Sequence, residues 1–223
     1  QPISITHVKG NLAVAHNGNL VNAGELRREI ELDGGIFRSS NDTEVLVYTI
    51  VKERLKCASI EEAVLSTMKR IEGAYSLVVM SPRKLIAARD PHGFRPLCIG
   101  LLDGDCYVFA SETCALDALG AKFVRDVEPG EVCVVENGKL RSMHCDIKCK
   151  TSACVFEYIY FARPDSIIDG ASVELARQEA GKYLSIEHPV GADVVIGVPD
   201  SGIPAAIGYA KFSGIPYGVG LIK

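Results

Sequence analysis

The stretch "NLAVAHNGNLVNAGEL", residues 11–26, decides the fold of the first part of the chain. Apolar residues alternate with small or polar ones at its start, as in a half-buried β-strand. Residues 16–19 are then His-Asn-Gly-Asn, and a helical pattern follows them. The strand is predicted to stop at the Asn-Gly turn signal. A turn needs only one or two such residues, so four of them indicate either an extended loop or a set of donors directed at a ligand.

Three helical patterns follow this stretch. Asn22 and Glu25 have the spacing of a capping box, which predicts a helix through about Leu32. The segment "SSNDTEVLVYTIVKERL" predicts a second helix with Asn41 as its cap, and "SIEEAVLSTMKRIEG" predicts a third with Ser59 as its cap. Helices are therefore expected to cover one side of the strand that precedes them.

The hydrophobic period changes to two after residue 73. The alternating segments are "AYSLVVMSP", "KLIAARD", "LCIGLLD", "CYVFASE" and "EVCVVENGKLRS". Turn residues separate them, so an antiparallel meander is predicted. A strand, then helices, then a meander is typical of an α+β layered domain, which we assign to residues 1–144.

The pattern changes again near residue 145. The segments "ASVELARQEAGKYLSIE" and "IPAAIGYAKFSG" are helical, whereas "ADVVIGVPDSG" and the start of "IPYGVGLIK" have the apolar runs of buried strands. This alternation predicts a βαβ unit with a parallel sheet, so residues 145–223 are assigned to a second, α/β domain. One βαβ unit cannot bury both of its faces, and the sequence does not begin with Met. It is therefore expected to be an internal part of a longer protein.

The composition restricts the class of protein. Hydrophobic residues make up 48% of the 223 residues and charged residues 23%, as in globular proteins. The net charge of −4 argues against a nucleic acid or an anionic membrane as the partner. No apolar run approaches the roughly 18 residues that span a bilayer. The composition therefore indicates a globular protein, and a local basic patch on its surface is still compatible with this net charge.

Eight cysteines are present, and none of them forms a C-x-x-C pair. Without a secretory signal, reduced and mostly buried thiols are expected, which favours a cytoplasmic location. Cys145, Cys149 and Cys154 form the one cluster that is close enough in sequence to test for a metal. The loose spacing favours structural thiols over a metal site.

Several motifs resemble one family. The segments "AHNGNLVNAGELR", "SSNDTEVL", "RIEGAYSLVVM", "ARDPHGFRPLCIG" and "ASETCALDALGA" resemble the glutaminase half of the glutamine phosphoribosylpyrophosphate (PRPP) amidotransferases. "FEYIYFARPDS" and "GVPDSGIPAAIGYAKFSGIPYGVGLIK" resemble the start of the phosphoribosyltransferase half. The H-N-G-N-L motif also occurs in glucosamine-6-phosphate synthase and asparagine synthetase, so the last two segments narrow the family. The implied fold is part of an N-terminal-nucleophile amidohydrolase sandwich, followed by the start of an α/β phosphoribosyltransferase domain with a parallel sheet.

The resemblance implies roles for residues of the first domain. In this family the nucleophile is an N-terminal Cys, expected here upstream of Gln1 with a segment that binds the glutamine carboxylate. The side-chain amide of Asn17 and the backbone N–H of Gly18 then form the oxyanion hole, and Asp42 pairs with the glutamine ammonium. The alternatives are a plain Asn-Gly hairpin turn and a first-turn acid that interacts with the helix dipole. His16 is interpreted as structural.

The resemblance also implies a phosphate site in the second domain. The loop "GVPDSG" joins a predicted strand to a helix, where backbone N–H groups favour anions. Asp200, Ser201 and Gly202 are therefore candidate pyrophosphate ligands. The alternative is an ordinary loop in which Ser201 caps the helix. The Mg²⁺ ion that accompanies PRPP is expected to have its ligands beyond Lys223.

One branch of the family holds a [4Fe–4S] cluster. Its first ligand comes immediately before the E-Y-I-Y-F stretch, and Cys154 is at that position. The other three ligands are expected beyond Lys223, and a buried structural thiol is the alternative.

The implied function is the first step of purine biosynthesis. Glutamine supplies ammonia, which converts PRPP to 5-phosphoribosylamine with release of glutamate and pyrophosphate. A homo-oligomer is expected, with glutamine and PRPP as its small-molecule partners. This chain alone is expected to be inactive, because the nucleophile and the PRPP loop lie outside it. The alternatives are a glutaminase module of another amidotransferase and a non-catalytic ligand-binding homologue.

Overall fold

The computed structural model describes residues 1–223, which fall into two units. The first unit consists of Gln1–Ser111 and Leu119–Ala153, and the second of Glu112–Ala118 and Cys154–Lys223. No helix in either unit has the length and apolar character that crossing a bilayer requires.

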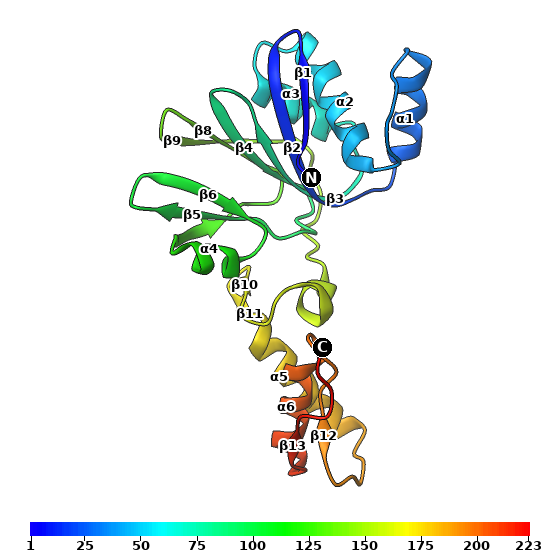
Figure 1. Ribbon diagram of the computed structural model, residues 1–223, viewed down its shortest axis with the longest axis vertical. Coiled ribbons are helices and arrows are strands. Elements are labelled where there is room, and N and C mark those ends of the chain that lie inside the picture. Colours follow the sequence, from blue (N-terminus) through cyan, green and yellow to red (C-terminus); the bar gives the residue numbers. More distant parts are fainter. The chain divides into compact units, whose positions relative to one another are not determined.

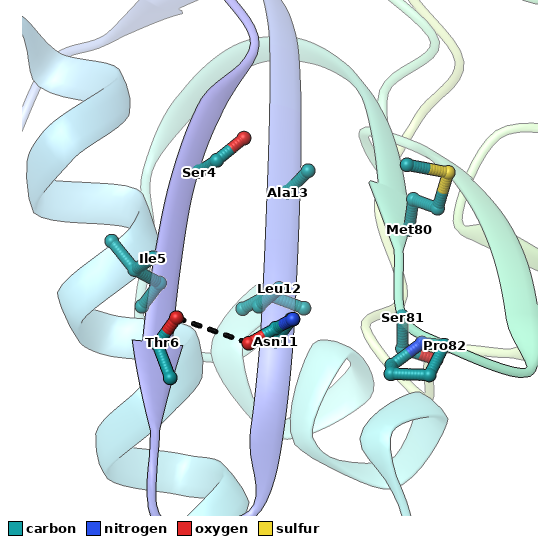
Figure 2. Close-up of a pocket in the computed structure, with 9 residues that line it drawn as sticks. All are labelled: Ser4, Ile5, Thr6, Asn11, Leu12, Ala13, Met80, Ser81 and Pro82. Carbon is teal, nitrogen blue, oxygen red and sulfur yellow. Dashed lines mark hydrogen bonds between the residues drawn. The ribbon is translucent and has the colours of Figure 1, made fainter.

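The first unit contains two antiparallel sheets (Figure 1). In the larger sheet the strand order is β1-β2-β3-β4-β8-β9. These strands are Ile3–His7, Gly10–Leu20, Gly73–Met80, Lys84–Arg89, Glu131–Glu136 and Lys139–His144. In the smaller sheet the order is β6-β5-β7. Its strands are Cys106–Ala110, Cys98–Leu102 and Lys122–Asp126.

Three helices pack on one face of the larger sheet, and the smaller sheet packs on the other. The helices are α1 (Ala23–Leu32), α2 (Asp42–Lys56) and α3 (Ile60–Met68). Along β4, Ile86 and Ala88 are buried in the core shared with the helices, whereas Ala87 is buried in the core shared with the smaller sheet. Side chains alternate between the faces of a strand, so β4 serves both cores. The predicted α+β layers are confirmed.

The caps of α2 and α3 are as predicted. Asn41 accepts the N–H of Thr43, and Ser59 forms a reciprocal capping box with Glu62. The capping box predicted for α1 is absent, because the side chain of Asn22 has other partners.

Asn22 joins the start of α1 to the chain before β3. Its Nδ2 donates to the carbonyl of Arg70 at 2.9 Å, and its Oδ1 accepts the N–H of Glu72 at 3.0 Å. The Asn22 side chain thus binds two backbone groups that are 48 and 50 residues away in sequence, instead of capping its own helix.

The prediction that the first strand stops at the Asn-Gly dipeptide is wrong. β2 runs through it to Leu20, and its register pairs Asn17 with Ser76 and Gly18 with Tyr75. Gly18 has a φ of +151°, and a Cβ at this position would overlap the carbonyl oxygen of Ala74. A glycine is needed here because two strands approach closely, and continuous pairing with β3 outweighs the local turn signal.

The predicted meander is only partly observed. All five predicted segments form strands, but β5 and β6 belong to the smaller sheet, in which β5 pairs with both β6 and β7. β7, Lys122–Asp126, was not among the predicted strands, because its side chains are mostly exposed and its sequence does not alternate.

The second unit contains most of α4 (Thr113–Leu119), a π-helical turn η1 (Glu157–Phe161), and the short strands β10 (Ile167–Ile168) and β11 (Ala171–Ser172). They are followed by α5 (Val173–Glu187), β12 (Val195–Ile196), α6 (Gly202–Ser213) and β13 (Tyr217–Gly218). β12 and β13 are parallel, as the alternating pattern predicted. A Cβ at Gly181 of α5 or at Gly208 of α6 would overlap the backbone of the other helix, so these glycines allow close helix packing.

Candidate active site

The end of β2 presents Asn17 to the smaller sheet. Leu12, Val14 and His16 are buried on the helix side of the strand, and Asn17 therefore points to the opposite side. Its side chain is exposed, and Nδ2 donates to the Oγ of Ser111 at 3.0 Å. Ser111 directly follows β6, so this bond joins the two sheets where both strands end.

The contact with Ser111 fixes the plane of the Asn17 amide. A side-chain amide carries two N–H donors, and Ser111 accepts only one of them. The second donor is available to a ligand beside the backbone of Gly18. A neutral amide and an adjacent backbone N–H are the kind of donors that stabilise an oxyanion.

Asp42 is fixed against the same strand end. It is the first residue of α2, and its Oδ2 accepts the N–H of Leu20 at 3.0 Å. Leu20 lies two residues beyond Gly18, so the structure brings together the three residues named from the sequence in this domain. The Asp42 side chain retains 21% exposure and can therefore meet a charged ligand.

His16 links the strand to the helix but is not placed as an acid or base. Its Nδ1 lies 3.3 Å from the Oγ1 of Thr43 and 3.6 Å from the Oδ1 of Asp42, and the side chain is 1% exposed. Burial, only partly opposed by the charge of Asp42, lowers the pKa of His16 below its usual value. A neutral imidazole at pH 7 agrees with the structural role predicted for it.

Two further residues in this network were missed from the sequence. The side chain of Gln1 accepts the His16 N–H at 2.6 Å through Oε1 and donates to the Oγ1 of Thr43 at 3.2 Å through Nε2. Gln1 therefore joins β2 to the start of α2. No local motif marks these contacts, because they join residues 15 and 42 positions apart.

The loop "DPHGFRPL", residues 90–97, is hydrogen-bonded to β3, the strand that pairs with β2. The carboxylate of Asp90 is fully buried and accepts backbone N–H groups of His92, Phe94 and Arg95. Burial raises the pKa of Asp90, although these N–H groups act in the opposite direction. The Oγ of Ser76, opposite Asn17, donates to the carbonyl of Pro96 at 2.9 Å. The loop thus holds the strand that faces the candidate oxyanion donors.

Two buried cysteines of the first unit, Cys98 and Cys133, do not have the features of an activated nucleophile. All eight cysteines of the chain are free thiols. Cys98 is 2% exposed and donates to the carbonyl of Ala110, and burial raises the pKa of Cys133 to about 12. A reactive thiol needs access and a lowered pKa. Neither buried thiol meets these conditions.

The three clustered cysteines do not form a metal site of their own. Cys145 and Cys149 belong to the first unit and Cys154 to the second. The one group of three potential ligands close enough to share an ion is Glu128, Glu131 and His144, without a cysteine. Cys154 is half-buried and precedes η1, where its carbonyl accepts the N–H of Glu157.

The candidate phosphate loop joins β12 to α6. Ser201 occupies the N-cap position, but its side chain makes no capping bond, so the predicted alternative of a serine cap is not observed. Asp200, which follows a cis peptide bond, forms an exposed ion pair with Lys223 at 3.1 Å. Asp200 also lines a groove of about 450 Å³ with Arg163, Pro164 and Asp165. The two motifs of this unit therefore meet at one surface.

Comparison with known proteins identifies the family. The family described as "Glutamine amidotransferase domain" matches residues 1–118, which include all of the candidate glutamine site. The chain belongs to the glutamine amidotransferase family.

Individual proteins that resemble this chain match both of its units. The amidophosphoribosyltransferase of Methanocaldococcus jannaschii is 48% identical over 100% of the chain and 50% of its own length. That of Bacillus subtilis is 49% identical over 96% of the chain and 44% of its own length. The solved structure of the B. subtilis glutamine PRPP amidotransferase with ADP and GMP matches all of the chain and 49% of its own length, with a TM-score of 0.93 and 48% identity. The chain thus spans about half the length of these relatives, and the resemblance found in the sequence is confirmed.

Proposed function

We propose that this chain is part of an amidophosphoribosyltransferase, which uses ammonia from glutamine to convert PRPP to 5-phosphoribosylamine. Glutamate and pyrophosphate are the other products. The observation that carries this proposal is the match at 48% identity over both units, rather than over the glutaminase domain alone. A glutaminase module of another amidotransferase would not explain the match of residues 154–223.

The first unit supplies the glutamine site in this proposal. A cysteine thiolate that precedes Gln1 attacks the amide carbon, and the carbonyl oxygen becomes an oxyanion. The free N–H of the Asn17 amide and the backbone N–H of Gly18 donate to that oxygen. Asp42 pairs with the ammonium group of glutamine. Collapse of the intermediate expels ammonia and leaves a thioester, which water hydrolyses to glutamate.

The second unit is the start of the phosphoribosyltransferase domain in this proposal. The parallel pair of β12 and β13, with α6 between them in sequence, supports this assignment. The hydroxyl of Ser201 makes no capping bond at the start of α6 and is therefore a donor that an anion could use, and Asp200, Ser201 and Gly202 would hold the pyrophosphate group of PRPP. The Mg²⁺ ion bound with PRPP would take its ligands from outside this chain.

Cys154 is proposed as one thiolate ligand of a [4Fe–4S] cluster. Cys154 is a half-buried free thiol that precedes η1 in the sequence. In the complete enzyme purified without oxygen, Cys154→Ser should abolish the brown colour of the cluster, whereas Cys145→Ser should retain it. A colourless wild-type enzyme would make Cys154 a structural thiol.

The proposed function is tested by measuring phosphoribosylamine synthesis with glutamine and, separately, with added ammonia as the nitrogen donor. In the complete enzyme, Asn17→Ala should lower kcat with glutamine by about 10²–10³, the usual cost of one oxyanion donor. Synthesis of phosphoribosylamine from added ammonium salt should be unchanged, because it bypasses the oxyanion.

The matched control is Asn11→Ala, an exposed asparagine at the other end of β2. It should leave both activities unchanged. A loss of less than threefold in Asn17→Ala, or an equal loss with glutamine and ammonia, would contradict the role of Asn17. Absence of PRPP-dependent product in the wild-type enzyme would contradict the proposed function itself.

A further inference from the structure

A second pocket in the first unit lies at the opposite end of β2 from the glutamine site. It has a volume of about 410 Å³ and is lined by five basic residues. These are His7, Lys9, Arg54, Arg83 and Lys84, which we call the basic pocket. With about 3.3 Å per residue, the six residues from Asn11 to Asn17 place it about 20 Å along the strand from the oxyanion donors.

Three connections that are distant in sequence form the basic pocket. His7 and Lys9 lie at the turn between β1 and β2, Arg54 lies in the last turn of α2, and Arg83 and Lys84 lie where β3 turns into β4. The turn before β4 is closed by the N–H of Ser81, which donates to the carbonyl of residue 84 at 2.9 Å. The positive charges therefore converge through tertiary structure and not through a basic run in the sequence.

The carboxylates near the pocket are already engaged. Glu61 accepts Lys84 at 2.7 Å and also pairs with Arg141, while Glu136 lies 3.5 Å from Lys84. The carboxylate of Glu62 accepts the backbone N–H groups of the segment that leads into α3. Glu61 and Glu136 therefore offset the charges of Lys84 and Arg141, and Glu62 is engaged by the backbone.

Three cations of the basic pocket have no carboxylate partner. Lys9 and Arg83 are exposed, and Arg54 is half-buried with its Nη1 donating to the carbonyl of Cys57 at 2.7 Å. His7 accepts the Lys9 N–H at its Nδ1, which leaves Nε2 as the donor of the neutral ring. The pocket thus gathers unmatched positive charge in a chain whose net charge is −4.

We propose that the basic pocket binds a phosphate-class oxyanion, either inorganic phosphate or a phosphate ester. Arginine forks and lysine ammonium groups are the side chains that recognise such anions. The volume lies within the range of about 300–1,000 Å³ that small molecules occupy. Leu12, Ile60 and Pro82 add apolar wall, which leaves room for the organic part of an ester. This site is independent of the glutamine chemistry proposed above.

The pKa of the His7 imidazole is expected to change when an anion binds in the basic pocket. Burial and the charge of Arg54 lower the pKa of His7. A bound dianion would stabilise the imidazolium form and move that pKa upward. The Cε1–H signal of His7 in NMR spectra of the complete protein, assigned by its absence in His7→Gln, therefore detects occupancy of this pocket and not of any other phosphate site.

The test titrates sodium phosphate, and separately glycerol 3-phosphate, with sodium chloride holding the ionic strength constant. A saturable shift of the His7 signal is expected with at least one probe, and the tighter probe distinguishes free phosphate from an ester. The double variant Lys9→Gln/Arg83→Gln should bind at least about tenfold more weakly, because two of the charges that attract the anion are lost. Ala58→Glu, which adds a negative charge to the rim, should abolish binding.

The control is Arg28→Gln, an exposed arginine on α1 outside the pocket, which should bind like the wild type. The side chains of Lys9, Arg28, Ala58 and Arg83 are exposed and that of His7 is half-buried, and a thermal melt checks that each variant folds. The proposal is overturned if neither probe gives a saturable shift, if chloride alone gives the same shift, or if Arg28→Gln weakens binding as much as the double variant.

Discussion

Two regions of the chain bring a strand together with the start of a helix, and they differ in what holds their polar groups. Near the end of β2, Asp42 is bound by the N–H of Leu20, and Asn17 is bound by Ser111. In the loop from β12 to α6, the Ser201 hydroxyl makes no capping bond, and Asp200 has one exposed ion pair with a lysine. The polar side chains of the first region are held by hydrogen bonds before a ligand binds. In the second region the N–H groups of Gly202 and Ile203 donate to backbone carbonyls, and the Ser201 hydroxyl is left without a capping bond.

This difference fits the chemistry proposed for the two regions. An oxyanion exists only during the reaction, so its donors must be fixed in advance. A pyrophosphate group is present in the substrate itself, and the positive end of a helix with an uncommitted hydroxyl is sufficient to attract it. Substitutions in the first region should therefore change the kinetic constants with glutamine. Substitutions in the second region should change the free energy of unfolding little.

After Asn17→Ala, the largest effect is expected at Asp42. Asp42→Asn keeps an oxygen that can accept the Leu20 N–H but removes the charge that we propose pairs with the glutamine ammonium. Removing one charge of such a pair costs about 2–5 kcal/mol of binding free energy, so KM for glutamine should rise at least tenfold. The midpoint of thermal unfolding should hardly change. If stability falls while KM stays constant, Asp42 acts only on the helix.

A smaller effect is expected at Ser111, which positions Asn17. Ser111→Ala removes one hydrogen bond of about 0.5–1.5 kcal/mol, so kcat with glutamine should fall by up to about tenfold, with little change in KM. Ser111→Thr keeps the hydroxyl and should restore kcat. Equal losses in both variants would mean that the hydroxyl does not orient the amide.

The smallest effects are expected for two serines at helix starts, which should differ in their contribution to the free energy of unfolding. Ser59 accepts the N–H of Glu62 in a capping box, whereas Ser201 makes no such bond. Ser59→Ala should therefore lower the free energy of unfolding by about 1 kcal/mol, and Ser201→Ala by less than about 0.5 kcal/mol. Urea titration of both variants measures the difference. Equal losses would show that Ser201 caps α6 in solution.

The sequence was a good guide wherever local chemistry decides the structure. The caps at Asn41 and Ser59 were predicted because a cap depends on the residue and its next three neighbours. It was a poor guide where partners distant in sequence compete with local signals. The Asn-Gly turn was replaced by pairing with β3, and the cap expected at Asn22 was replaced by contacts with the segment before β3.

The candidate site shows the same division. Asn17, Gly18 and Asp42 were named from motifs that resemble a known family, and the structure places Asp42 against the strand that carries the other two. Gln1 and Ser111 were not named. Ser111 meets Asn17 across 94 residues of sequence, and only the packing of the two sheets brings them together.

The most direct test of the account is a crystal structure of the complete enzyme with a glutamine analogue that forms a covalent adduct with the nucleophilic cysteine. The adduct oxygen is expected to lie about 2.7–3.1 Å from the Nδ2 of Asn17 and from the backbone nitrogen of Gly18. The analogue's ammonium should lie at Asp42, and the bond from Asn17 to Ser111 should persist. An adduct oxygen that is bound by other donors, with Asn17 turned away, would contradict the assignment of the oxyanion hole.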